Sequence, residues 1–147
     1  MSTENEFFKV LWFRVQVEEA FSGHGRKSSE ATIKVEVRTR DGKTETVHKV
    51  ADGIGPVNAL DNALRKALNG FFPEVANVCL VDYEVHKRNG KEGTESLVEV
   101  TITSSDGTNK WVTKATSGNI IRASLVALAK SLKSELLHMM VPIKAPA

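Results

Sequence analysis

Alternating hydrophobic and polar positions dominate the first third of the chain. The most regular alternation runs over residues 30–39 and predicts a half-buried strand, with the apolar positions Ala31, Ile33, Val35 and Val37. A shorter alternation from Phe13 to Val17 predicts a strand within residues 7–21, and a third strand is expected at about residues 44–51. Asp41-Gly42 is a strong hairpin-turn signal between the second and third strands.

A helical period follows these strands. Gly53-Ile54-Gly55-Pro56 ends the third strand, and Pro56 suits the first turn of a helix. This helix is predicted to end near Gly70, and its apolar stripe consists of Leu60, Leu64, Ala67 and Leu68. The second half repeats the order, with strands at about 79–87, 95–104 and 109–116 before a helix at about 119–140.

The two halves also resemble each other residue by residue, which indicates an internal duplication. Asp41-Gly42 corresponds to Asp106-Gly107 at an offset of 65 residues, whereas the helices align at an offset of 64. This difference predicts one extra residue near Gly53-Ile54. Each half is therefore a predicted β-β-β-α unit, with pseudo-repeats at about residues 10–71 and 78–140. The predicted fold class is α+β, with helices packed on one face of antiparallel sheets.

Length and charge narrow the class of protein. A chain of 147 residues predicts one domain over residues 1–147. Its 20 basic and 18 acidic residues are interleaved, so they give little support to nucleic-acid binding. No apolar stretch is long enough to span a bilayer, and the acidic start does not resemble a signal peptide. We expect a cytoplasmic protein that does not bind membranes.

The residues that usually carry chemistry do not form a recognisable catalytic or metal-binding pattern. Cys79 has no partner for a disulfide, and its apolar neighbours favour a core thiol over a reactive nucleophile. None of the histidines lies at metal-ligand spacing from another histidine or from the cysteine: His24, His48, His86 and His138. We therefore expect no metal, no cofactor and no catalytic residues.

The two strand-to-helix junctions are the best candidates for a binding site. Residues 51–56 and 115–120 each place small residues directly before a helix, whose first N–H groups attract anions. Asp52, Ser117 and Asn119 could cap their helices or contact a ligand, and capping is the favoured interpretation at each position. A ligand is suggested by the match between the junctions, which a duplication would bring together around a pseudo-twofold axis.

The segments that open the two helices, Asp52–Leu60 and Ser117–Ser124, resemble a known family. They are similar to the C-terminal regulatory (allosteric dimerisation) domain of the 2-isopropylmalate synthase and citramalate synthase family, and the resemblance covers about residues 10–137. Residues 55–68 and 80–85 resemble the citramalate synthase branch more. The resemblance implies a homodimeric domain that binds isoleucine or leucine and thereby inhibits an acetyl-CoA-dependent condensing enzyme. The catalytic TIM barrel of that enzyme is absent from this chain.

The family's effector pocket can be carried onto this sequence. The first junction would contribute Ala51, Asp52, Gly53 and Gly55. The second would contribute Ala115, Thr116, Ser117, Gly118 and Asn119. The expected apolar walls are Leu68, Phe72, Tyr83 and Val85. Ile54 departs from the family's common Gly-Asp/Asn-Gly-Pro form, which puts the shape of this pocket in question.

Three other functions stay open at this point. The first is a small RNA-binding α+β module, although Tyr83 and Trp111 alone make no stacking platform on the predicted strands. The second is a dimerisation domain without a ligand. The third, an enzyme in its own right, has the least support because no catalytic pattern is present.

Overall fold

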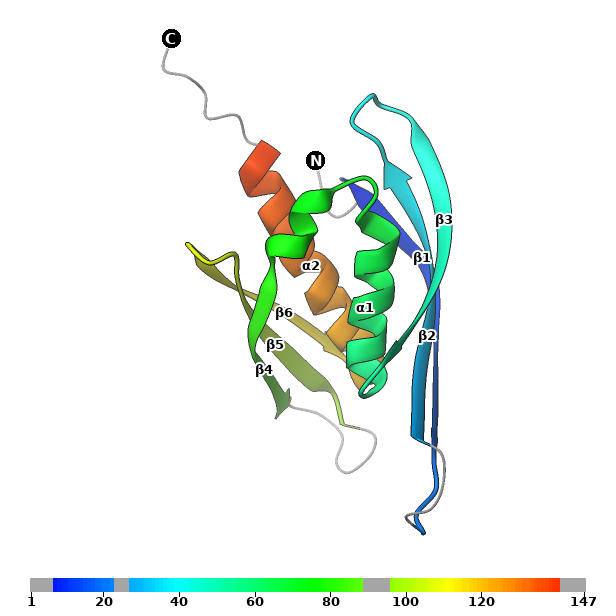
Figure 1. Cartoon of the computed structure of the whole chain (residues 1–147). Helices are drawn as coiled ribbons and strands as arrows, with labels where there is room; N and C mark the ends of the chain where they lie inside the picture. Colours follow the sequence, from blue (N-terminus) through cyan, green and yellow to red (C-terminus); the bar gives the residue numbers. More distant parts are fainter. Residues whose placement is uncertain (1–6, 23–26, 89–95, 141–147) are drawn as a thin grey trace. The chain divides into compact units, whose positions relative to one another are not determined.

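The computed structural model of the chain describes residues 7–22, 27–88 and 96–140. Within them a β-β-β-α order occurs twice, and a short 3-10 helix, Pro73–Asn77, lies between the two sets (Figure 1). The chain divides into two compact units, residues 1–73 and 74–147, and each predicted pseudo-repeat lies within one unit. The predicted α+β class with repeated β-β-β-α units is confirmed. That the whole chain acts as a single regulatory domain stays a prediction.

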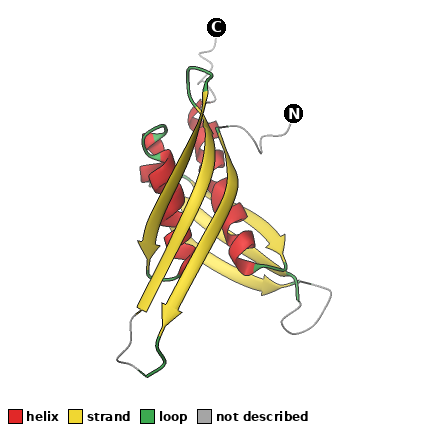
Figure 2. Cartoon of the chain, turned by 90° about the vertical axis from the view of Figure 1, so that its right-hand side faces the viewer, coloured by secondary structure: helices red, strands yellow, loops and turns green. Residues whose placement is uncertain are grey.

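The first unit is a three-stranded antiparallel sheet with one helix packed on it. Its strands are β1 (Phe8–Glu19), β2 (Lys27–Arg38) and β3 (Thr44–Gly53), in the order β1-β2-β3. Helix α1 (Pro56–Leu68) contacts mainly β2 and β3. Figure 2 shows this sheet from the face that α1 does not cover. The alternating apolar residues of β2 are all fully buried, as predicted: Ala31, Ile33, Val35 and Val37.

The second unit repeats this arrangement. Its strands are β4 (Cys79–Lys87), β5 (Val98–Ser105) and β6 (Lys110–Ser117), in the order β4-β5-β6. Helix α2 (Ile120–Met140) contacts β5 and β6. Hydrogen bonds fix the helix on the sheet: Thr113 Oγ1 donates to the Ala127 carbonyl at 2.8 Å, and Trp111 Nε1 donates to the Ser131 carbonyl at 3.1 Å. Helix α2 therefore packs on β6 through these polar contacts as well as through its buried apolar residues.

Both units contain the same lysine bond between helix and strand. Lys66 Nζ on α1 donates to the carbonyl of Val50 on β3 at 3.1 Å. Lys130 Nζ on α2 donates to the carbonyl of Lys114 on β6 at 2.9 Å. Both members of the second pair lie 64 residues after those of the first (130 − 66 and 114 − 50). The duplication therefore extends to individual contacts.

The predicted site of the extra residue, near Gly53-Ile54, is wrong. The two junctions have equal length. Two residues separate the end of β3 at Gly53 from the start of α1 at Pro56, and two separate the end of β6 at Ser117 from the start of α2 at Ile120. The length difference lies in the β2–β3 hairpin, which is longer than the β5–β6 hairpin. From the row of Ala31 and Val100 onward it has two more strand pairs, and its turn has one more residue (39–43 compared with 106–109). The row of paired residues Val15, Ala31 and Ala51 corresponds to Val85, Val100 and Ala115. A constant offset of 65 therefore misaligns the first two strands.

The expectation of a core thiol at Cys79 is also wrong. Cys79 is exposed at the start of β4, whereas its neighbour Val78 is 2% exposed. The apolar run of residues 78–81 favoured a buried position for this thiol. However, β4 is an edge strand, and α2 packs on β5 and β6. Among the described helices, none is both long and apolar enough to cross a membrane.

Candidate functional site

The first junction contains two glycines in different surroundings. Gly53 lies so close to α1 that a Cβ atom on it would be 2.3 Å from the backbone nitrogen of Ala59. Gly55 is the N-cap residue of α1, has an extended backbone, and makes no side-chain cap. No atom lies within 4 Å of the position that a Cβ on Gly55 would take. The junction is therefore closed against the helix at Gly53 and open at Gly55.

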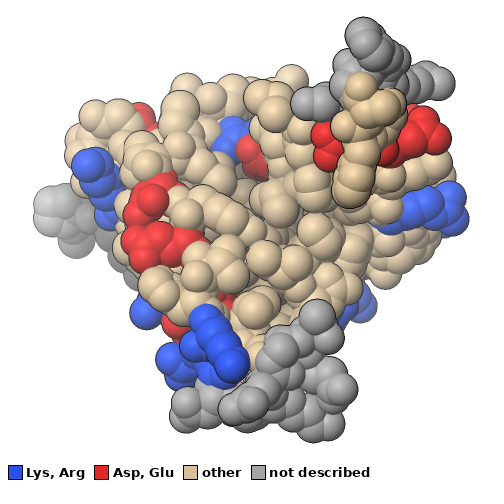
Figure 3. Space-filling view, turned by 90° about the horizontal axis from the view of Figure 1, so that it is seen from below, with Lys and Arg blue, Asp and Glu red and all other residues tan. Residues whose placement is uncertain are grey.

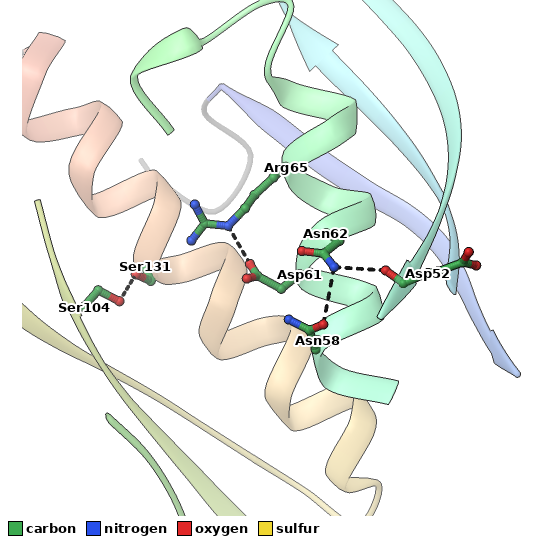
Figure 4. Close-up of polar contacts among 7 residues, drawn as sticks. All are labelled: Asp52, Asn58, Asp61, Asn62, Arg65, Ser104 and Ser131. Atoms are coloured by element: carbon green, nitrogen blue, oxygen red, sulfur yellow. Dashed lines mark hydrogen bonds and ion pairs between the residues drawn. The ribbon is translucent and has the colours of Figure 1, made fainter. Parts of the chain in front are cut away.

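Two asparagines of α1 hold this junction. The N–H of Ile54 donates to Asn58 Oδ1 at 2.9 Å. Asn62 Nδ2 donates to the Asp52 carbonyl at 2.9 Å and to Asn58 Oδ1 at 3.4 Å (Figure 4). Neither Asn58 nor Asn62 was among the site residues predicted from the sequence. Their four-residue spacing just inside a predicted helix was the available signal, because such residues lie on one face of a helix.

Asp52 does not cap α1. Ala51 and Gly53 face the helix, so the side chain of Asp52 lies on the opposite face of β3, where Asp52 pairs with Glu30. Figure 4 shows its carboxylate pointing away from α1. The Asp52 backbone carbonyl, and not the carboxylate, contacts the helix through Asn62. A contact between this carboxylate and a ligand stays a prediction.

The second junction is closed by its own side chains. Asn119 Oδ1 accepts hydrogen bonds from the N–H groups of Ile121 at 2.9 Å and Arg122 at 3.2 Å, which makes it the N-cap of α2. Ser117 Oγ accepts from the Asn119 N–H at 3.0 Å. The capping interpretation is therefore confirmed for Asn119, and Ser117 supports it. Gly118 and Thr116 are exposed beside them.

Apolar side chains of the second unit gather around the N-terminal end of α2. The hydroxyl groups of Tyr83 and Ser124 lie 2.7 Å apart, one turn inside the helix. Val85 pairs with Val100, which in turn pairs with Ala115. Two further members were not predicted from the sequence. Leu97 Cδ2 lies 4.0 Å from the position of a Cβ on Gly118, and Ile120 is the first residue of α2. The exposed fractions of the apolar members are 38% for Tyr83, 40% for Val85, 43% for Leu97 and 40% for Ile120.

Leu68 and Phe72, predicted as pocket walls, lie elsewhere in the first unit. Both are buried, and the N–H of Phe72 donates to the Leu68 carbonyl at 2.7 Å. Leu68 is the last residue of α1, about 20 Å from Gly55 at 1.5 Å per residue, and Phe72 follows the helix. The Phe72 ring packs edge-on against Phe7, with centroids 5.9 Å apart. Within this unit the structure therefore does not bring them to the first junction.

Among the residues that the structure describes, no three His, Cys, Asp or Glu side chains come together as a metal site would require. His24 lies outside the described residues. The three other histidines lie on β3, β4 and the last turn of α2: His48, His86 and His138.

Comparison with known proteins places the chain in a family. Residues 1–136 match the LeuA allosteric (dimerisation) domain. The (R)-citramalate synthase of Geobacter sulfurreducens is 44% identical over 136 residues, which cover 92% of this chain and 25% of the relative. The corresponding enzyme of Streptomyces coelicolor is 41% identical, over 84% of this chain and 22% of the relative. The 2-isopropylmalate synthase of Salinibacter ruber is 34% identical, over 76% of this chain and 19% of the relative.

This chain therefore spans about a quarter or less of the length of each of these relatives. The match to the family, by contrast, covers nearly the whole chain. The chain belongs to the family of LeuA allosteric (dimerisation) domains, which occur in citramalate and 2-isopropylmalate synthases.

Proposed function

We propose that this chain binds a branched-chain amino acid, isoleucine or leucine, and thereby mediates feedback inhibition of an acetyl-CoA-dependent 2-oxo acid condensing enzyme. The observation that carries the proposal is the match of residues 1–136 to an allosteric domain. Its proposed partners are a second copy of the chain and the catalytic barrel of a parent synthase, and the chain itself performs no catalysis. Location in the cytoplasm stays a prediction.

The chemistry of the junctions supports an amino acid as the ligand. A zwitterion needs N–H donors for its carboxylate, carbonyl or carboxylate acceptors for its ammonium group, and an apolar surface for its side chain. The first N–H groups of a helix have no partner within the helix, and no side chain caps α1 at Gly55. In the second unit, the exposed Tyr83 and Val85 offer apolar surface. Burying a leucine or isoleucine side chain contributes roughly 1.5–3 kcal/mol.

The identity of the effector depends on shape, because leucine and isoleucine have the same number of carbons. Pockets that discriminate by one methyl position typically do so by about 1–3 kcal/mol. The chain is 44% identical to a citramalate synthase and 34% identical to a 2-isopropylmalate synthase. Five citramalate synthases are 41–44% identical to the chain, which favours isoleucine, the effector expected for the citramalate branch.

Isothermal titration of the chain with four amino acids tests the proposal. We expect heat of binding for isoleucine or leucine and none for lysine or glutamate, because a charged side chain would have to leave water for an apolar surface. A second arm uses Gly55→Trp, which places a large ring in the open space beside the junction. This variant should keep the circular dichroism spectrum and lose binding. Equal heat, or no heat, with all four amino acids would refute the effector assignment.

The RNA-binding alternative has less support. On the face shown in Figure 3, Lys and Arg side chains form small groups separated by acidic and uncharged residues. Tyr83 and Trp111 hydrogen-bond to α2 instead of presenting free rings. Trp12 is 38% exposed, but its ring packs edge-on against His48. Retention of RNA on a filter at low salt, and its loss at high salt, would revive this alternative.

A further inference from the structure

The first junction is unusual because it combines glycines with an uncapped helix. Glycine has the greatest backbone freedom of all residues, and Gly53 and Gly55 flank Ile54. Asn119 caps α2 from within the second junction, whereas Gly55 offers α1 no side-chain cap. Beyond the pairing of Asp52 and Gly53 with β2, order in residues 52–55 therefore depends on bonds that reach back from α1.

Those bonds form an asparagine clasp, which we define as Asn58 and Asn62. Asn58 Oδ1 accepts from the N–H of Ile54, the residue between the two glycines. Asn62 Nδ2 uses two donor hydrogens, one for the Asp52 carbonyl and one for Asn58 Oδ1. The second bond fixes the orientation of Asn58, so the two side chains act together (Figure 4). The clasp spans the junction from Asp52 to Ile54.

Its counterpart is absent from the second unit. At the helix offset of 64, Asn58 and Asn62 correspond to Arg122 and Val126, which do not hold the second junction in the same way. There, Ser117 and Asn119 make the bonds instead. The two junctions thus have the same length and are ordered by opposite means. Of the two junctions, only the first has its backbone held by side chains from within the following helix.

We propose that Asn58 and Asn62 are positioning residues for effector binding. They hold the Gly53-Ile54-Gly55 backbone in its binding-competent shape before the effector arrives. This inference rests on the proposed function, because the clasp positions the same junction. A loop ordered in advance loses less conformational entropy when a ligand binds. Ile54 is 98% exposed, so its hydrogen bond to Asn58 takes the place of packing at this residue.

Three alanine variants of the full chain, together with Asn58→Asp, test the clasp. Asn58→Ala removes the acceptor of the Ile54 N–H, and Asn62→Ala removes the donor to the Asp52 carbonyl. Lys66→Ala is the matched control, because it removes a bond from the same helix to the same strand, at Val50. The measurements are amide hydrogen exchange at Ile54 by NMR, titration with isoleucine and leucine, and thermal unfolding.

We expect Asn58→Ala to speed exchange at Ile54 at least tenfold and to weaken effector binding about tenfold, which corresponds to about 1.4 kcal/mol. Asn62→Ala should weaken binding in the same direction. Lys66→Ala should leave both quantities within twofold. Asn58→Asp keeps an oxygen acceptor and should restore slow exchange at Ile54, which a general loss of stability would not allow.

The outcomes separate this inference from the proposed function. An unmodified chain that binds neither amino acid refutes the proposed function, and the positioning role with it. If the unmodified chain binds and both asparagine variants bind equally well, the positioning role alone is refuted. It is also refuted if Lys66→Ala weakens binding as much as Asn58→Ala does, or if Asn58→Ala leaves exchange at Ile54 unchanged.

Discussion

At the scale of single residues, Gly53 and Gly55 are a matched pair. A Cβ on Gly53 would lie 2.3 Å from the nitrogen and 2.6 Å from the Cα of Ala59, and both are backbone atoms that cannot rotate away. A Cβ on Gly55 would meet no atom within 4 Å. The backbone of Gly55, with φ −147° and ψ −178°, is open to any residue.

We therefore expect Gly53→Ala to lower the free energy of unfolding by about 1–3 kcal/mol, the usual cost of forcing a methyl group into a packed site. Gly55→Ala should change it by about 0.5 kcal/mol or less, because the lower entropy of the unfolded chain offsets the poorer N-cap. Urea unfolding of both variants measures the two values. Equal losses of stability would show that Gly53 has no special contact with α1.

The residue scale also shows what the sequence could predict at the candidate site. The capping role of Asn119 followed from its place before a helix and is confirmed. The same argument applied to Asp52 was wrong, because strand alternation places its side chain on the opposite face from α1. The clasp was not predicted because only residues before the helix were considered as caps, whereas Asn58 and Asn62 bind backwards from inside the helix.

At the scale of elements, alternation alone predicted the strands well. The inward residues of β2 and the helical stripe of α1 are buried as expected. Strand pairing was harder to predict, because similar strands can be aligned at several offsets of equal parity. Only the observed rows, such as Val85 with Val100 and Ala115, fix the alignment of the repeats. Burial of Cys79 failed for a related reason, since an edge position is not visible in the apolar pattern of one strand.

Helix α2 and the β5–β6 hairpin are joined by a pair of carboxyl groups. Asp106 Oδ1 accepts from the N–H groups of Asn109 at 2.8 Å and Thr108 at 2.9 Å, and these bonds lower the pKa of Asp106. Glu135 on α2 is 4% exposed. Burial raises the pKa of Glu135, and its hydrogen bond to the charged Asp106 raises it further, while His138 acts weakly in the opposite direction. Glu135 is therefore the proton donor of the pair.

This pair predicts how stability changes with pH. Because the pKa of Glu135 is higher in the folded chain than in the unfolded chain, its contribution is complete at pH values below the unfolded pKa. It is lost as the pH rises through the folded pKa. Glu135→Gln keeps an N–H donor for Asp106 and carries no charge. We expect this variant to be more stable than the unmodified chain at pH 8 by about 1 kcal/mol, a rise of about 3 °C in Tm.

The advantage of Glu135→Gln should shrink towards pH 4, where Glu135 is protonated in the folded chain and mostly protonated in the unfolded chain. Thermal unfolding of both proteins at pH 4 and pH 8 measures the difference. An equal difference at the two pH values would show that the carboxyl pair does not titrate as described.

At the scale of the whole molecule, exposed apolar side chains along β4 bear on assembly. This edge strand carries a run of exposed apolar residues, with exposed fractions of 50% for Val81, 38% for Tyr83 and 40% for Val85. An edge strand with unpaired backbone groups and apolar side chains is a common site of association. β6, the other edge of the same sheet, has one large exposed apolar residue among those described, Val112 at 55%. The family match to a dimerisation domain gives the expected state.

We expect sedimentation equilibrium to give a homodimer, with twice the 16.1 kDa mass of the chain. Val81→Lys should weaken the dimer at least tenfold, because a charge would enter an apolar contact along β4. Val112→Lys is the control of equal chemistry and similar exposure on β6, and it should leave the dimer intact. We also expect isoleucine to bind without dissociating the dimer, because the effector is proposed to act on the assembled domain. A single 16.1 kDa species at all concentrations would rule out the dimer, and equal effects of the two lysines would move the contact away from β4.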